Sequence, residues 1–68
     1  MLAKNIKKHR NKRGFSQEDL ARKAGITYSA LSKIEAGYVQ NPRILTVQKI
    51  ALALEVTIDD LMGDVESD

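Results

Sequence analysis

The sequence contains no cysteine and only one histidine among its 68 residues. Disulfides, thiolate metal sites and histidine-based zinc sites are therefore excluded as supports for a small fold, and we expect no metal and no cofactor. No apolar run approaches the roughly 20 residues that span a membrane, so we expect no membrane partner. The basic N-terminus lacks the apolar stretch of a signal peptide, which makes the cytoplasm the expected location.

The chain is also too short for two domains or a large enclosed site. A domain of this size buries only about 60% of the surface of its unfolded chain, so its core needs the side chains that would line a pocket of several hundred Å³. The sequence shows no nucleophile–base pair, metal-ligand set or phosphate loop, and we do not expect an enzyme. We expect one domain over residues 1–62 and an acidic C-terminal tail over residues 63–68.

The charges are distributed unevenly along the chain. Residues 1–33 carry nine Lys or Arg against two acidic residues, a net charge of +7, whereas residues 34–68 carry two against seven, a net charge of −5. A basic half beside an acidic half indicates a polyanionic partner on one side of the molecule. A charged face that contacts only solvent remains an equally good interpretation of charge alone.

Apolar residues recur at helical spacing almost throughout, and no strand-like alternation is sustained. Helices are expected over residues 2–13, 17–24, 28–36 and 44–54, with a short fifth helix after Thr57. The expected capping residues are Ser16, Thr27 and Thr57, and the expected helix stops are Gly14, Gly25 and Gly37. In the fourth helix the inward stripe is Ile44, Val47, Ile50, Ala51 and Leu54. The fold class is therefore all-α.

The third helix has one apolar face and one polar face. Its outward residues, Tyr28, Ser29, Ser32 and Lys33, carry groups that can contact base edges in the major groove. Taken alone, such a face is more often simply solvated. The short turn from Gly25 to Thr27, however, makes the second and third helices a helix-turn-helix. Gln17 lies at the N-terminus of the second helix, where free backbone N–H groups attract phosphate oxygens.

These motifs resemble the Cro-like phage-repressor helix-turn-helix family, also called the XRE family. The resemblance covers roughly residues 3–62 and is carried by residues 14–21 (GFSQEDLA), 23–27 (KAGIT), 31–37 (LSKIEAG), 41–42 (NP) and 49–54 (KIALAL). It implies a lambda-repressor-like bundle of five helices. Members of the family are mostly transcriptional repressors that bind DNA palindromes as homodimers.

The resemblance also implies roles for individual residues. Gln17 matches a residue that contacts phosphate and supports the reading helix. The positions that match base-contacting residues are Tyr28, Ser29, Ser32 and Lys33. The loop positions that match backbone or minor-groove contacts are Tyr38, Gln40, Asn41 and Arg43. Arg10 and Glu35 match an ion pair between the first and third helices, although Arg10 read alone is equally well a surface cation.

Two departures from the family pattern concern the fourth helix and the turn after it. The family usually has glycine where Glu55 stands, so this turn is expected to be strained or built differently. Leu45 and Leu52 replace residues that are commonly polar; they lie seven residues apart, opposite the core stripe, at the spacing of a helix–helix seam. Val56 and Ile58 follow and extend the patch. We expect a homodimer interface here, although two exposed leucines are also ordinary for a protein surface.

The sequence thus predicts a sequence-specific regulator of transcription, expected to be a repressor, that binds double-stranded DNA as a homodimer at a palindromic operator. RNA polymerase is a further candidate partner, because the regulator would act by blocking or touching it. The alternative is an antitoxin-like or other protein-interaction module that uses the same fold.

Overall fold

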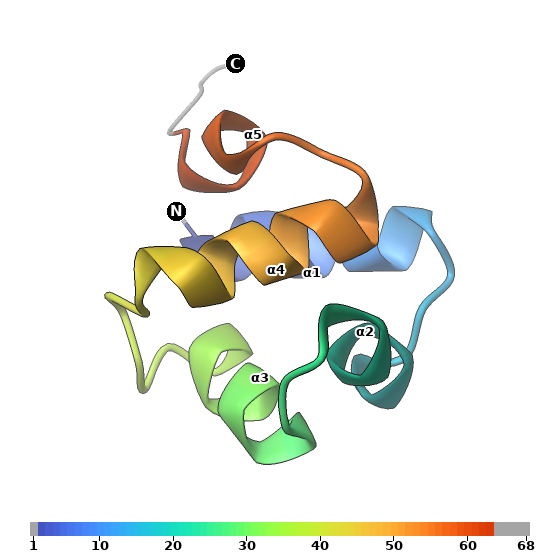
Figure 1. The fold of residues 1–68 in the computed structure, drawn as a ribbon, viewed down its shortest axis with the longest axis horizontal. Helices are drawn as coiled ribbons and strands as arrows, with labels where there is room; N and C mark the ends of the chain where they lie inside the picture. The colour runs from blue at the N-terminus through green and yellow to red at the C-terminus, as the bar shows by residue number, and fades with distance from the viewer. Residues whose placement is uncertain (1, 64–68) are drawn as a thin grey trace.

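The computed structural model describes residues 2–63, which fold into five helices (Figure 1). The helices are α1 (Leu2–Lys12), α2 (Gln17–Ala24), α3 (Tyr28–Glu35), α4 (Ile44–Leu54) and α5 (Ile58–Met62). Strands are absent from this part of the chain, and the expected all-α architecture is confirmed. No helix within it is long and apolar enough to span a membrane. Of the expected acidic tail, only Gly63 lies within the described residues.

Side-chain caps fix where three of the helices begin. Ser16 Oγ accepts a hydrogen bond from the Asp19 N–H at 3.0 Å, and the Asp19 carboxylate accepts one from the Ser16 N–H at 3.0 Å. Thr57 and Asp60 form the same reciprocal arrangement at the start of α5. Thr27 Oγ1 accepts from the Ala30 N–H at 3.0 Å and starts α3. The expected caps are therefore present, and each satisfies a backbone donor that a helix N-terminus leaves free.

All five helices contribute to one core. The fully buried side chains include Ile6 from α1, Leu20 from α2, Leu31 from α3, Ile50 from α4 and Leu61 from α5. Figure 1 shows α4 crossing in front of α1, with α2 and α3 below this pair and α5 above it. The helices α3 and α5 therefore lie at opposite ends of the molecule.

The expected inward stripe of α4 is wrong at its first residue. Val47, Ile50, Ala51 and Leu54 are buried, but Ile44 is 65% exposed. The Cα–Cβ bonds of a helix tilt toward its N-terminus, so the first side chain projects beyond the end of α4 rather than over the core. Ile44 therefore adds to the exposed apolar surface of α4.

Glu55 ends α4 in a left-handed conformation, with φ 59° and ψ 41°. Among the described residues it is the only non-glycine residue with positive φ. Its backbone N–H hydrogen-bonds to the carbonyls of Ala51 and Leu52, which closes the last turn of the helix. The turn thus has the backbone shape that favours glycine, and a side chain there carries a conformational cost.

Asn5 joins the first helix to the last. Its side-chain amide donates hydrogen bonds to the carbonyl oxygens of Leu61, at 2.7 Å, and Gly63, at 3.0 Å. These carbonyls belong to the C-terminal end of α5, where backbone acceptors lack partners within the helix. The short α5 is therefore fixed against α1 by hydrogen bonds as well as by the burial of Leu61.

Candidate nucleic-acid interface

The turn between α2 and α3 sets the angle at which α3 leaves the molecule. Gly25 ends α2 in the left-handed region, with φ 72° and ψ 31°, and its N–H bonds back to the carbonyls of Ala21 and Arg22. The Ile26 N–H bonds to the Ala21 carbonyl at 3.0 Å, and its side chain packs against the core. With Thr27 capping α3, three residues complete the change of direction. The two helices form a helix-turn-helix.

α3 presents its polar face to solvent. Leu31 and Ile34 are buried on the inner side of the helix. Tyr28, Ser29 and Lys33 are exposed on the outer side, and Ser32 is half-buried beside them. The four residues expected to contact bases therefore share one accessible face of a helix that is held by its opposite face. Hydroxyl and ammonium groups on such a face can form hydrogen bonds with the edges of base pairs.

A buried carboxylate ties α3 to α1 and α2. The side chain of Glu35 is 2% exposed and pairs with Arg10, with 2.9 Å between Arg10 Nε and Glu35 Oε2. Arg10 Nη2 and the Gln17 side-chain amide both donate to Glu35 Oε1, at 3.1 and 3.0 Å. Arg10 Nη1 donates to the Phe15 carbonyl at 2.9 Å. Because a buried charge is tolerated only when it is paired and hydrogen-bonded, this network fixes the end of α3.

Gln17 therefore occupies a specific place in the network. Its backbone begins α2, and its half-buried side chain reaches across to Glu35 of α3. The N-terminus of α2 also carries Asp19, whose pKa is lowered chiefly by the hydrogen bond from the Ser16 backbone and further by Arg22. The start of α2 is thus joined to α3 through the Gln17–Glu35 hydrogen bond. The sequence pointed to Gln17 as a site residue, but it did not indicate that Arg10 also donates a hydrogen bond to the Phe15 carbonyl.

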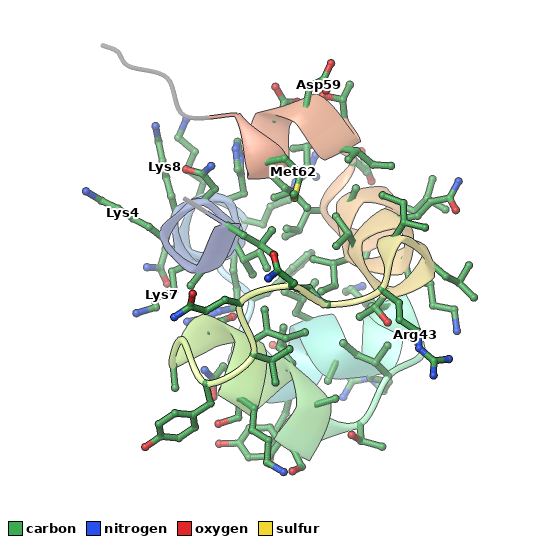
Figure 2. The ribbon with its side chains drawn as sticks, turned by 90° about the vertical axis from the view of Figure 1, so that its left-hand side faces the viewer. Lys4, Lys7, Lys8, Arg43, Asp59 and Met62 are labelled. Atoms are coloured by element: carbon green, nitrogen blue, oxygen red, sulfur yellow. The ribbon has the colours of Figure 1, made fainter. Side chains whose placement is uncertain are left out.

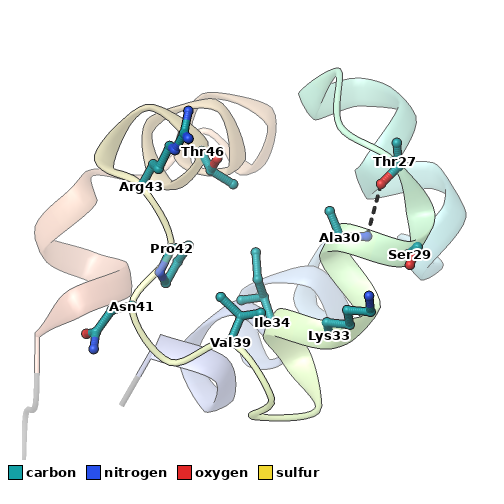
Figure 3. Close-up of a pocket in the computed structure, with 10 residues that line it drawn as sticks. All are labelled: Thr27, Ser29, Ala30, Lys33, Ile34, Val39, Asn41, Pro42, Arg43 and Thr46. Carbon is teal, nitrogen blue, oxygen red and sulfur yellow. Dashed lines mark hydrogen bonds between the residues drawn. The ribbon is translucent and has the colours of Figure 1, made fainter.

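An open hollow of about 500 Å³ lies between α3 and the loop that leads to α4. In Figure 3, Ser29 and Lys33 lie on one side of it and Asn41 and Arg43 on the other, with Ile34 between them. The expectation that no pocket of several hundred Å³ would form is therefore wrong. It considered an enclosed cavity taken from the core, whereas this hollow is a surface gap between two elements.

The loop residues are accessible, as their expected role requires. The loop residues Tyr38, Gln40, Asn41 and Arg43 are all exposed, and Tyr38 most of all, at 83%. The N–H groups of Tyr38 and Val39 both bond to the Lys33 carbonyl, which places the start of the loop directly against α3. The loop and α3 therefore border the same hollow.

The four residues expected at a dimer interface fall into two groups. Leu45 and Leu52 are exposed on the outer face of α4, at 57% and 72%. Val56 and Ile58 are half-buried and pack against the core, so they contribute less to an accessible patch. Ile44, which the sequence placed inward, is exposed beside Leu45 in the chain. The apolar surface of α4 is therefore Ile44, Leu45 and Leu52.

Comparison with known proteins agrees with the helix-turn-helix seen in the structure. The sequence profile of the family HTH_3, described as helix-turn-helix, matches residues 6–61. The transcriptional regulators SinR of Bacillus licheniformis and Bacillus subtilis are each 36% identical to this chain over 64 residues, which is 94% of the chain and 58% of either relative. SlrR of Bacillus subtilis is 36% identical over 61 residues, 40% of its length. The chain therefore spans little more than half the length of these SinR proteins.

Solved structures agree over almost the whole chain. The N-terminal DNA-binding domain of SinR from Bacillus subtilis superposes with a TM-score of 0.90 at 36% identity, covering 94% of this chain and 93% of that one. SinR in complex with DNA superposes with a TM-score of 0.89 at 36% identity, covering 93% and 100%. These similarities extend over all five helices. The chain belongs to the XRE-type helix-turn-helix family.

Proposed function

We propose that this chain is a sequence-specific DNA-binding regulator of transcription rather than an enzyme. The observation that carries the proposal is the exposed polar face of α3, held beside the start of α2 by the network in which Arg10 and Gln17 bind the buried Glu35. A rigid helix with accessible hydroxyl and ammonium groups is what readout in the major groove requires. The similarity to a SinR structure that contains DNA supports the same role.

The proposed contacts divide into two kinds. Tyr28, Ser29, Ser32 and Lys33 read base edges from α3. The residues that contact phosphates or the minor groove are Gln17, Tyr38, Gln40, Asn41 and Arg43. The hollow would accept the wall of the groove, with Ser29 and Lys33 on one side of it and Asn41 and Arg43 on the other (Figure 3). Contacts of the first kind give specificity, and contacts of the second kind give position and affinity.

The regulator would act as a homodimer at a palindromic operator. Leu45 and Leu52 lie on the outer face of α4 and are free to form a two-fold seam between copies. Such a pair would place two reading helices about 34 Å apart, which matches half-sites separated by one turn of DNA. A bound dimer would then repress transcription by excluding RNA polymerase from the promoter.

Selection of bound sequences from a pool of random duplex DNA tests this proposal. We expect a palindromic motif whose half-site centres are about 10 base pairs apart. Enrichment of a single half-site would argue against the homodimer while leaving sequence-specific binding intact. A pool that shows no enrichment over several rounds would refute the DNA-binding role.

A second candidate function rests on the apolar surface of α4. Ile44, Leu45 and Leu52 could form the docking site of a different protein, as in an antitoxin-like module. One similar structure is that of a SinR–SinI protein complex, with a TM-score of 0.90 at 36% identity, covering 94% of this chain and 62% of that one. This candidate is favoured if the chain is monomeric in solution and the random pool shows no enrichment.

A further inference from the structure

The outer face of α1 carries four lysines, Lys4, Lys7, Lys8 and Lys12, which we call the α1 lysine face. All four are exposed, and at 100° per residue they fall within an arc of about 140°. Figure 2 shows Lys4, Lys7 and Lys8 projecting from the same side of α1. Within residues 2–63 no ion pair involves any of them, and the first turn of α1 contains no acidic residue.

This arrangement is unfavourable for an isolated helix. Lys4 and Lys8, and likewise Lys8 and Lys12, are four residues apart, a spacing at which like charges repel. Lys4 also lies near the helix N-terminus, where the helix dipole disfavours a cation. A face that served solubility alone would gain from mixed signs, as on α2, where Arg22 pairs with Asp19. The α1 lysine face therefore suits a polyanionic ligand.

The position of the face favours DNA as that ligand. Lys7 lies one helical turn before Arg10, on the side of α1 that faces α3. Lys12 ends α1 shortly before the turn that leads to Gln17. The α1 lysine face therefore comes nearest to α3, and to the residues proposed to hold a phosphate strand, at Lys7. The rise from Lys4 to Lys12 is about 12 Å, a length over which duplex DNA carries about seven charges.

We propose that the α1 lysine face binds phosphates of the duplex that flanks the sequence read by α3. This inference rests on the proposed function, because it assumes that α3 is seated on an operator. The contact is electrostatic and independent of the flanking sequence. It adds affinity only when the duplex extends beyond the operator.

The test compares the selected operator alone with the same operator extended on both sides by about 10 base pairs of unselected sequence. The wild-type chain should bind the extended duplex more tightly. The variant Lys7→Gln/Lys8→Gln should bind the operator alone as the wild type does and should lose the gain from the flanks. The matched control Arg22→Gln/Lys23→Gln removes the same charge from α2 and should keep that gain. Circular dichroism of each variant verifies the fold.

Salt dependence gives a second readout. Each phosphate contact contributes about 0.9 to the slope of log affinity against log salt concentration. On the extended duplex, both proteins should lose affinity when salt rises from 50 to 200 mM. The fold-loss for Lys7→Gln/Lys8→Gln should be about 12 times smaller than the fold-loss for the wild type, because two phosphate contacts are missing.

The possible failures are distinguishable. If the wild type binds the operator but gains nothing from the flanks, the proposed function stands and the inference is wrong. If the variant keeps the gain, the α1 lysine face does not bind DNA, and an acidic protein segment becomes its candidate ligand. If the wild type binds no operator, the proposed function fails and this inference fails with it.

Discussion

Both oxygens of the Glu35 carboxylate accept hydrogen bonds from the guanidinium of Arg10, 25 residues earlier in the chain. This fork-to-fork geometry fixes direction as well as distance, because two parallel bonds resist rotation of either side chain. Glu35 is the last residue of α3, so the pair sets the tilt of the polar face of α3 relative to α1. The stability of the fold and the placement of the polar face of α3 thus depend on the same two side chains.

The first prediction concerns this pair. Arg10→Met leaves the Glu35 carboxylate buried without its cation and should lower the free energy of unfolding by roughly 3 kcal/mol. Arg10→Met/Glu35→Leu removes both charges and should recover most of that loss. Urea denaturation measures both variants. A double variant no more stable than the single one would show that the ion pair is not the source of the loss.

The second prediction separates base reading from phosphate contact. Lys33→Ala and Ser29→Ala should each relax discrimination at particular base pairs by roughly 1–3 kcal/mol. Arg43→Ala should weaken binding to all sequences more evenly, since phosphate contacts carry no direct sequence information. Selection from random duplexes, repeated with each variant, makes the comparison. If the selected motif is unchanged by Lys33→Ala, Lys33 does not contact bases specifically.

The third prediction concerns the outer face of α4. Leu45→Lys/Leu52→Lys places two cations at the proposed seam and should give a folded, helical monomer that binds the operator much more weakly. Tyr38→Lys, a change at an exposed aromatic residue outside α4, serves as a control and should remain dimeric. Sedimentation measures the state of each variant. A dimeric double variant, or a wild type that is monomeric both free and on a full operator, contradicts the seam.

The fourth prediction uses the left-handed turn at residue 55. Glu55→Gly should relieve a conformational cost of about 1 kcal/mol. It also removes the exposed ion pair with Arg13, in which 3.3 Å separates Arg13 Nη2 from Glu55 Oε1, but such pairs contribute little. The thermal midpoint should rise, by up to about 4–8 °C if the full cost is recovered. Glu55→Gln removes only the ion pair and should leave the midpoint nearly unchanged. A lower thermal midpoint for Glu55→Gly would show that the side chain at residue 55 carries no such cost.

The fifth prediction concerns acid stability. The Thr57 backbone N–H, followed by the Thr57 hydroxyl, lowers the pKa of Asp60 below its ordinary value of 3.8. The ionised carboxylate is therefore favoured in the folded state, and its contribution to stability is complete above the unfolded pKa and lost as the pH falls through the folded one. Asp60→Asn should flatten the fall in thermal midpoint below about pH 4. Identical slopes for both proteins would show that this cap does not titrate with folding.

The sequence predicts the helix starts well because their signals are local. Ser16, Thr27 and Thr57 each cap a helix through a backbone donor three residues later. Glu55 departs from the usual glycine, and its positive φ agrees with the turn that glycine would favour. Such features depend on a few neighbouring residues, so a pattern in the sequence is sufficient to indicate them.

Features that depend on distant elements were harder to predict. A helical wheel predicts the direction in which the Ile44 side chain points, but it does not predict how far the neighbouring helices extend along α4. In the structure Ile44 is exposed. Burial of Glu35 contradicts its polarity, and only the family resemblance suggested its pairing with Arg10. Its bond to the Gln17 side chain depends on how the tertiary fold places α2 beside α3, and the bond from Arg10 to the Phe15 carbonyl depends on the path of the turn after α1.

The hydrogen bonds from Asn5 to the end of α5 have a consequence for how the protein opens. A five-residue helix is too short to persist by itself, so α5 would be expected to fray first. Asn5 and the carbonyls of Leu61 and Gly63 instead close the chain into a loop of 56 to 58 residues. Opening of α5 then also exposes the side chains of α1 that pack against it. Amide hydrogens in α5 should therefore exchange in one cooperative unit with those of α1, at rates that reflect unfolding of the whole domain.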